Sequence, residues 1–179
     1  MNRRTFLTTI AGGLLVAPLA IWLLGVPGVA VADPQEAWAA LVKGGHVALI
    51  RHGNAPPGYG GDPPGFKIDD CATQRNLDDK GRAQGRTLGE AFRRHGVRAD
   101  KILSSPWCRC LETARLMALG PVDSTLAVAA SARSPERLAA MRQILADWRG
   151  PGTLVVVTHA LTVQALVGIM PGQAETVVV

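Results

Sequence analysis

The 179-residue sequence is poor in charge and in cysteine, and both shortages narrow the classes of protein it can be. Charged residues make up only 18% of the chain against 47% apolar residues, which excludes disorder as its main state. The net charge is +5, and +3 without residues 1–32, too small to indicate nucleic-acid binding. The three cysteines include no Cys-x-x-Cys pair, so we expect no structural zinc site. The length suits one compact domain.

Charge is also missing from residues 10–32, an apolar segment that follows Arg3 and Arg4. Its glycines and prolines argue against a buried helix. Ala30-Val31-Ala32 has the small-x-small pattern that signal peptidase accepts, and the whole segment resembles a twin-arginine export signal. The same length could instead stay in the bilayer. We therefore expect residues 1–32 to be a signal peptide or membrane anchor. Residues 33–179 would then form the exported domain, periplasmic or extracellular, which contacts a membrane only if that segment is uncleaved.

Residues 33–179 alternate apolar runs with helix signals. The apolar runs predict strands at 46–51, 101–104, 153–158 and 176–179. Capping residues and helical spacing predict helices from Asp33 to Gly44, from Asp78 to about Arg94, from Ser105, from Ser134, and over 161–169. Eight of the ten residues from 56 to 65 are proline or glycine, which predicts a long loop. The alternation predicts an α/β fold, a three-layer sandwich whose mostly parallel central sheet is flanked by helices.

Histidine or arginine stands at the end of three predicted strands. Arg51 and His52 close the first strand, Arg109 comes soon after the second, and His159 closes the third. Ligands of such sheets bind beyond the carboxyl ends of the strands, so these side chains are expected to converge. None of the three strand ends carries a carboxylate. The pattern therefore predicts a site for an anion.

These residue types suit a phosphoryl group. Arginine forks pair with phosphate oxygens and stay charged at any working pH. Arg109 falls in the first turn of its predicted helix, where free backbone N–H groups also favour a phosphate. A neutral imidazole such as His52 can attack phosphorus and form a phosphohistidine, which divides hydrolysis into two steps.

Three segments carry a resemblance to a known family. They are Leu49-Ile50-Arg51-His52-Gly53, then Ser104-Ser105-Pro106 with Arg109, Thr113 and Ala114 in fixed spacing, then Val157-Thr158-His159. Together with residues 74–84 they resemble the histidine phosphatase superfamily, which is phosphoglycerate mutase-like. The resemblance covers about residues 46–179. It implies that His52 is the nucleophile, that Arg51 and Arg109 bind the phosphoryl group, and that His159 completes the catalytic pocket and also contacts phosphate.

Two departures from the family pattern favour hydrolysis over mutase chemistry, and a third leaves the proton donor open. Asn54 stands where mutases usually have glutamate, and 147 mature residues leave no room for the mutases' extra segments. Ala160 follows His159, so the His-Asp donor of the acid phosphatase branch is missing. The candidates for the general acid are Asp69, Asp70, Asp123 and Glu175, and the sequence favours none of them.

The cysteines allow two interpretations. Reduced thiols are the simpler one, but an exported chain meets oxidant, which allows Cys71 to pair with Cys108 or Cys110. The pairing stays open, because Cys108 and Cys110 point in different directions on a helix.

Three function classes follow from these observations. The first is an exported phosphatase that hydrolyses phosphomonoesters or similar small phosphorylated compounds through phospho-His52, without metal or other cofactor. The alternative is a non-catalytic phosphate-ligand binding module of the same fold. The third, an exported metal-binding protein using His52, His159 and the cysteines, is disfavoured because two arginines beside the histidines repel a cation. The residues do not specify the physiological substrate or the oligomeric state.

Overall fold

The computed structural model describes residues 34–57, 61–129 and 133–179. The predicted signal peptide or anchor at residues 1–32 lies outside these ranges. Five strands form a single sheet: β1 (Val47–Arg51), β2 (Ala99–Ser104), β3 (Asp123–Ser124), β4 (Thr153–Thr158) and β5 (Thr176–Val178). Their order is β3-β2-β4-β1-β5, with β5 antiparallel to β1 and all other pairs parallel. Within the described ranges, no helix is long and apolar enough to cross a membrane.

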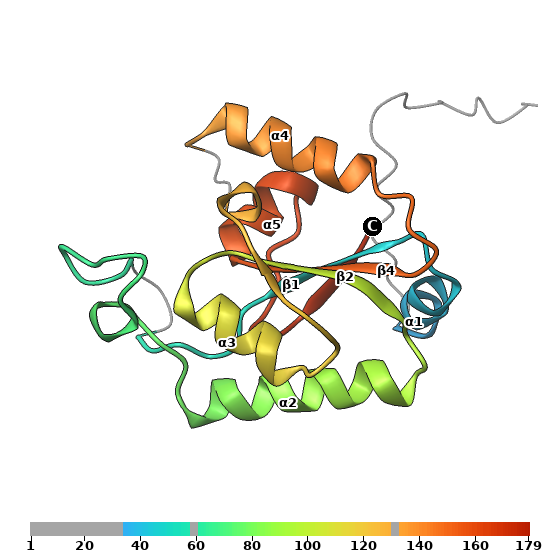
Figure 1. Ribbon diagram of the computed structural model, residues 1–179, viewed down its shortest axis with the longest axis horizontal. Helices are drawn as coiled ribbons and strands as arrows, with labels where there is room; N and C mark the ends of the chain where they lie inside the picture. The colour runs from blue at the N-terminus through green and yellow to red at the C-terminus, as the bar shows by residue number, and fades with distance from the viewer. Residues whose placement is uncertain (1–33, 58–60, 130–132) are drawn as a thin grey trace, which may run out of the picture.

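Helices cover both faces of the sheet and make three layers (Figure 1). One face packs against α1 (Pro34–Lys43), α2 (Asp79–Arg94) and α3 (Cys108–Leu116), and the other against α4 (Pro135–Ala146) and α5 (Ala160–Val167). Two short 3-10 helices, η1 (Cys71–Thr73) and η2 (Leu126–Val128), lie in the connections. Every residue of β1 and β4 is buried because helices stand on both sides of them. The predicted α/β sandwich with a mostly parallel sheet is confirmed.

Helix α2 begins where the sequence predicts, at the Asp78 cap. The Asp78 carboxylate accepts a hydrogen bond from the backbone N–H of Gly81 at 2.8 Å. Gly81 and Gly89 leave no room for a side chain: a Cβ atom at Gly81 would meet the Asn54 carbonyl, and one at Gly89 would meet the Met117 carbonyl. These two glycines therefore let α2 lie directly against two backbone segments, one after β1 and one after α3.

Several predicted boundaries are wrong by a few residues, and the start of α3 matters for the site. This helix begins at Cys108, not at Ser105, because the Ser105 backbone N–H donates to the Val157 carbonyl and so extends the sheet. Trp107 is the extended residue before the first turn. At the other end of the chain, α5 stops at Val167 because Gly168 takes a left-handed conformation with φ of 77°. The two-residue edge strand β3 was not predicted, since it is too short to give a sequence pattern.

Candidate active site

The four predicted site residues come together beyond the carboxyl ends of the sheet. Arg51, His52, Arg109 and His159 all line one cavity of about 580 Å³. The backbone N–H of His52 donates to the Thr158 carbonyl at 3.0 Å, which fixes the ends of β1 and β4 against each other. The rings of His52 and His159 lie edge to face with their centroids 5.6 Å apart. The convergence expected from the strand ends is therefore present in the structure.

One hydrogen bond sets the tautomer of His52. Its Nδ1 atom lies 2.8 Å from the carbonyl oxygen of Gly53, and a carbonyl can only accept, so Nδ1 carries the proton. In the neutral ring the lone pair is then on Nε2. The Gly53 backbone N–H donates to Thr113 Oγ1 at 3.0 Å, and Thr113 donates to the Arg109 carbonyl at 2.7 Å. His52 is thus held by the same α3 turn that carries Arg109.

Both histidines are kept neutral by their surroundings. Burial lowers the pKa of His52 from 6.5 to about 3, with the charges of Arg109, Arg51 and Arg75 adding to the effect against the raising influence of the Gly53 carbonyl. Burial likewise lowers the pKa of His159 to about 3, helped by Arg109. A neutral His52 is the form that has a lone pair for attack.

Arg109 approaches the cavity from the first turn of α3. Its Nη1 atom donates to Asp62 Oδ1 at 2.8 Å in a buried ion pair, and also to the Arg75 carbonyl at 3.3 Å. Its Nε atom is buried and has no hydrogen-bond partner among the described residues. Arg51 is oriented by a bond from Nη1 to the Pro171 carbonyl at 3.0 Å. The Arg109 guanidinium is therefore held in place through its Nη1 atom.

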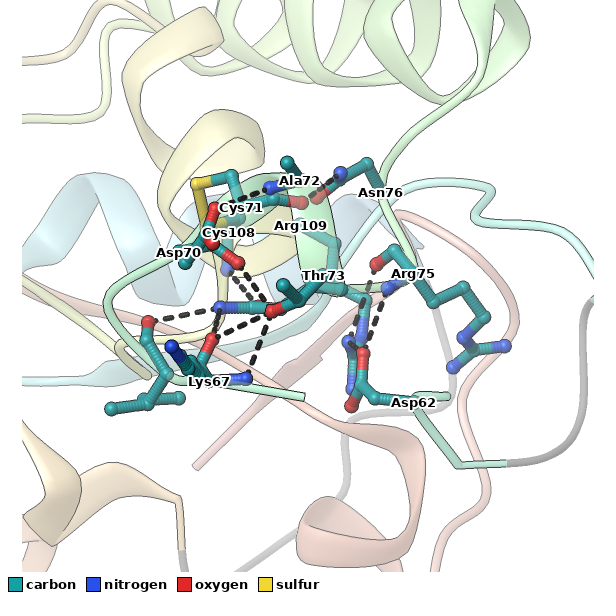
Figure 2. The surroundings of a disulfide bond; sticks show 12 residues. Asp62, Lys67, Asp70, Cys71, Ala72, Thr73, Arg75, Asn76, Cys108 and Arg109 are labelled. Atoms are coloured by element: carbon teal, nitrogen blue, oxygen red, sulfur yellow. Dashed lines mark hydrogen bonds and ion pairs between the residues drawn. A yellow bond between two sulfur atoms is a disulfide. The ribbon is translucent and has the colours of Figure 1, made fainter. Parts of the chain in front are cut away.

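Asp62 is a site residue that the sequence analysis missed. Its carboxylate accepts from Arg109, from the backbone N–H of Arg75 at 2.9 Å, and from Trp107 Nε1 at 2.9 Å (Figure 2 shows the first two). Burial raises the pKa of Asp62, but the hydrogen bonds from Arg75, Arg109 and Trp107 outweigh it and lower the pKa overall. Asp62 is therefore a fixed negative charge and not a proton donor. Its one sequence signal is that it is the only charged residue between Gly53 and Phe66.

Arg75 adds a third guanidinium to the cavity lining, also unforeseen. Its Nη1 donates to the Ala55 carbonyl at 3.1 Å, while its Nε is buried without a hydrogen-bond partner in the described ranges. Burial lowers the pKa of Arg75, and so does the nearby charge of Arg109. Repulsion between the two cations is offset in part by Asp62, which attracts both.

A disulfide fixes the segment that carries Arg75. Cys71 bonds to Cys108, the first residue of α3, so that residues 67–76 lie beside the Arg109 turn (Figure 2). The Gln74 side chain reinforces this contact by accepting from the Cys108 backbone N–H at 3.0 Å. Of the two pairings left open above, the structure has the one with Cys108. Cys110 is a free thiol, and burial raises its pKa to about 12.

The structure brings none of the four proposed proton donors to the cavity. Asp69, Asp70, Asp123 and Glu175 are exposed to solvent, and none of them is part of its lining. Asp70 caps η1, and Glu175 accepts from the Gly172 backbone N–H. Among the described residues, Asp62 is the only carboxylate that lines the cavity.

Three further polar contacts complete the surroundings. Ser105 Oγ lies 2.9 Å from His159 Nε2 and orients that ring. Asn54, at the position of the mutase glutamate, donates to Asp78 at 2.6 Å and accepts from Gln173 at 2.5 Å. Within the part of the chain that the structure describes, no three His, Cys, Asp or Glu side chains are grouped as metal ligands.

The fold and the site define an α/β protein with two neutral histidines and three arginines around one cavity. Residues 47–126 match the family model described as histidine phosphatase superfamily (branch 1), whereas no curated protein sequence matches the chain. This match extends from β1 to the first residue of η2, and it makes that part of the chain similar to the histidine phosphatase superfamily.

Solved structures with the same fold are distant in sequence. The product of the open reading frame Rv3214 from Mycobacterium tuberculosis is 16% identical with a TM-score of 0.59, covering 74% of this chain and 89% of that chain. A putative phosphohistidine phosphatase SixA from Agrobacterium tumefaciens is 20% identical with a TM-score of 0.52, covering 74% and 88%. The protein histidine phosphatase SixA in complex with tungstate is 16% identical with a TM-score of 0.53, covering 74% and 85%. At these identities the matches establish the fold alone.

Proposed function

We propose that this protein is a phosphatase that hydrolyses phosphomonoesters or similar small phosphorylated compounds through a phosphohistidine on His52. The observation that carries the proposal is the hydrogen bond from His52 Nδ1 to the Gly53 carbonyl, which leaves the Nε2 lone pair for phosphorus. The arginines that line the same cavity are placed to bind the phosphoryl oxygens.

The reaction proceeds in two steps. In the first, the Nε2 lone pair of His52 forms an N–P bond while the bond from phosphorus to the leaving group breaks, and its electron pair stays on the leaving group. The imidazole becomes cationic, and the Gly53 carbonyl stabilises its Nδ1 proton. In the second, water attacks phosphorus, the N–P bond breaks, and its electron pair returns to Nε2. Water's proton leaves to solvent, and the product is inorganic phosphate.

Charge on the transferred group is stabilised by the guanidinium groups of Arg51, Arg75 and Arg109. All three residues line the cavity, where guanidinium N–H groups can donate to phosphoryl oxygens. His159, held by Ser105, lies beside the His52 ring and would donate a hydrogen bond to a phosphoryl oxygen. Each such donor is typically worth ~10²–10³ in rate.

Among the described residues, no carboxylic acid is placed to give the leaving group a proton. Asp62 is ionised and its oxygens are occupied by three donors, so it cannot protonate the departing atom. This supports substrates whose leaving group departs as a stable anion or takes its proton from water. It also favours the second candidate function, a phosphate-binding module that has the anion site without efficient turnover.

Trapping of the covalent intermediate separates these two functions. We expect p-nitrophenyl [³²P]phosphate, quenched under alkaline conditions, to leave label on the wild-type protein and none on His52→Asn. His95→Asn is the matched control, because His95 is exposed and lies away from the cavity at the end of α2. Unlabelled wild-type protein that still binds tungstate would contradict the phosphatase and support the binding module.

We further propose that the domain acts outside the cytoplasm after export directed by residues 1–32. The proposal rests on the Arg3-Arg4 pair, the apolar run and the Ala30-Val31-Ala32 site. N-terminal sequencing of the exported fraction should find Asp33 first if the segment is cleaved, or Met1 in the membrane fraction if it is an anchor. Intact Met1 in a soluble cytoplasmic pool would contradict export.

A further inference from the structure

Beyond the arginines, the same cavity is lined by large apolar side chains that the proposed chemistry does not use. Four of them form what we call the apolar wall: Phe66, Trp107, Leu161 and Met170. They come from the proline- and glycine-rich loop, the turn before α3, the first turn of α5 and the segment after α5. Three further polar residues line the cavity: Ser134 and the exposed Arg137 at the start of α4, and the buried Thr162 on α5.

The aromatic half of the wall is held in place next to the histidines. Trp107 donates from Nε1 to Asp62, and its ring packs edge to face on His159 with centroids 5.2 Å apart. Phe66 lies against Trp107 with centroids 6.1 Å apart. Because the indole N–H is already bonded, the Trp107 ring offers an incoming ligand only apolar surface.

The aliphatic half is exposed to water although it lines a cavity. Leu161 is 65% exposed and Met170 is 41% exposed. A ligand that covers such apolar surface gains binding free energy of about 25 cal/mol for each Å² removed from water. A sugar or carboxylate held there would instead lose its hydration without gaining a partner from these side chains.

We infer that the leaving group of the substrate is an apolar aromatic group, which packs on the wall of Phe66, Trp107, Leu161 and Met170 while its phosphoryl group lies among the arginines. The inference rests on the proposed function for the position of the phosphoryl group. It agrees with the missing proton donor, because an aryl oxygen departs as a more stable anion than an alkyl oxygen does.

The test compares two non-hydrolysable ligands that differ by one fused ring. Phenylphosphonate and 1-naphthylphosphonate carry the same anionic group, and their affinities for the full mature domain are measured by calorimetry, with tungstate as competitor. The second ring buries roughly 50 Å² more apolar surface, so the naphthyl compound should bind about five- to tenfold more tightly. The double variant Leu161→Gln, Met170→Gln should reduce this preference to less than twofold.

Val42→Gln is the matched control, because Val42 is a half-exposed apolar residue on α1, far from the cavity lining. This variant should keep the wild-type preference. Equal affinities in the wild type, failure of both ligands to bind, or a preference that persists in the double variant would each overturn the inference. A naphthyl preference in a protein that forms no phosphohistidine would uphold the apolar site and overturn the phosphatase, so the two failures are distinguishable.

Discussion

Acidification below pH 6.5 should destabilise this protein because His52 and His159 remain neutral in the folded state. Both side chains have a folded pKa near 3, lowered mainly by burial, whereas an unfolded histidine titrates near 6.5. The unfolded chain therefore binds protons that the folded chain does not. The contribution of the two neutral histidines to the free energy of unfolding is fully present above pH 6.5. It is lost as the pH falls from 6.5 toward 3.

The size of the effect follows from the number of protons. Each histidine contributes a slope of about 1.4 kcal/mol per pH unit to the free energy of unfolding across most of this window. Between pH 6 and pH 4 one histidine thus removes about 2.5 kcal/mol. His52→Asn should lose less stability over this interval than the wild type does, by about that amount. Replacement of both histidines should remove about twice as much of the pH dependence.

Urea denaturation at pH 4, 5 and 6 measures these slopes directly. The carboxylates titrate in both the wild type and His52→Asn, so their effect on the pH slope cancels in the difference between the two proteins. Ser105→Ala is the control, since it removes the hydrogen-bond partner of His159 but keeps both imidazoles, and its slope should equal that of the wild type. An unchanged slope in His52→Asn would mean that His52 takes up its proton in the folded state, which would refute the neutral nucleophile.

Three other perturbations test the rest of the site. Arg75→Gln should weaken tungstate binding about tenfold, the equivalent of ~1.4 kcal/mol, whereas Arg82→Gln, which removes an exposed arginine paired with Glu112 on the surface, should change it less than twofold. Cys71→Ser should lower the free energy of unfolding by ~4 kcal/mol in the chain-entropy account of a 37-residue separation, and reductant should then have no further effect. Phosphatase activity should survive EDTA, because arginines supply the positive charge; loss on chelation with recovery on added metal would contradict this.

The strand ends could be read from the sequence because the pattern there is simple. β1 and β4 are continuous buried runs, and a parallel sheet places the residues after them at one edge. His52 and His159 follow these strands directly, so their positions needed no tertiary information. The predicted start of the helix that carries Arg109 was wrong, yet Arg109 does lie in its first turn. Few residues separate Arg109 from the end of β2, whether the helix begins at Ser105 or at Cys108.

Asp62, Arg75 and the disulfide partner could not be read in the same way. Asp62 belongs to a loop of prolines and glycines with no period, so nothing in its neighbourhood shows which way its side chain points. Arg75 precedes the α2 cap and enters the cavity only because Cys71 is bonded to Cys108 and Gln74 contacts the α3 turn. Contacts between segments that are distant in the sequence place these residues, so the local sequence does not predict where they lie.

The carboxylate of Asp62 explains how an anion site can hold three arginines before any anion arrives. Arg51, Arg75 and Arg109 surround two neutral histidines, and without a negative charge their mutual repulsion would favour an open loop. Asp62 offsets part of that repulsion through Arg109 Nη1 and the Arg75 backbone, yet it contacts neither buried Nε atom of these arginines. The remaining positive charge at the cavity stays available to an anion. The same carboxylate also holds Trp107 against His159, so the loop that completes the phosphoryl site positions the aromatic surface beside it.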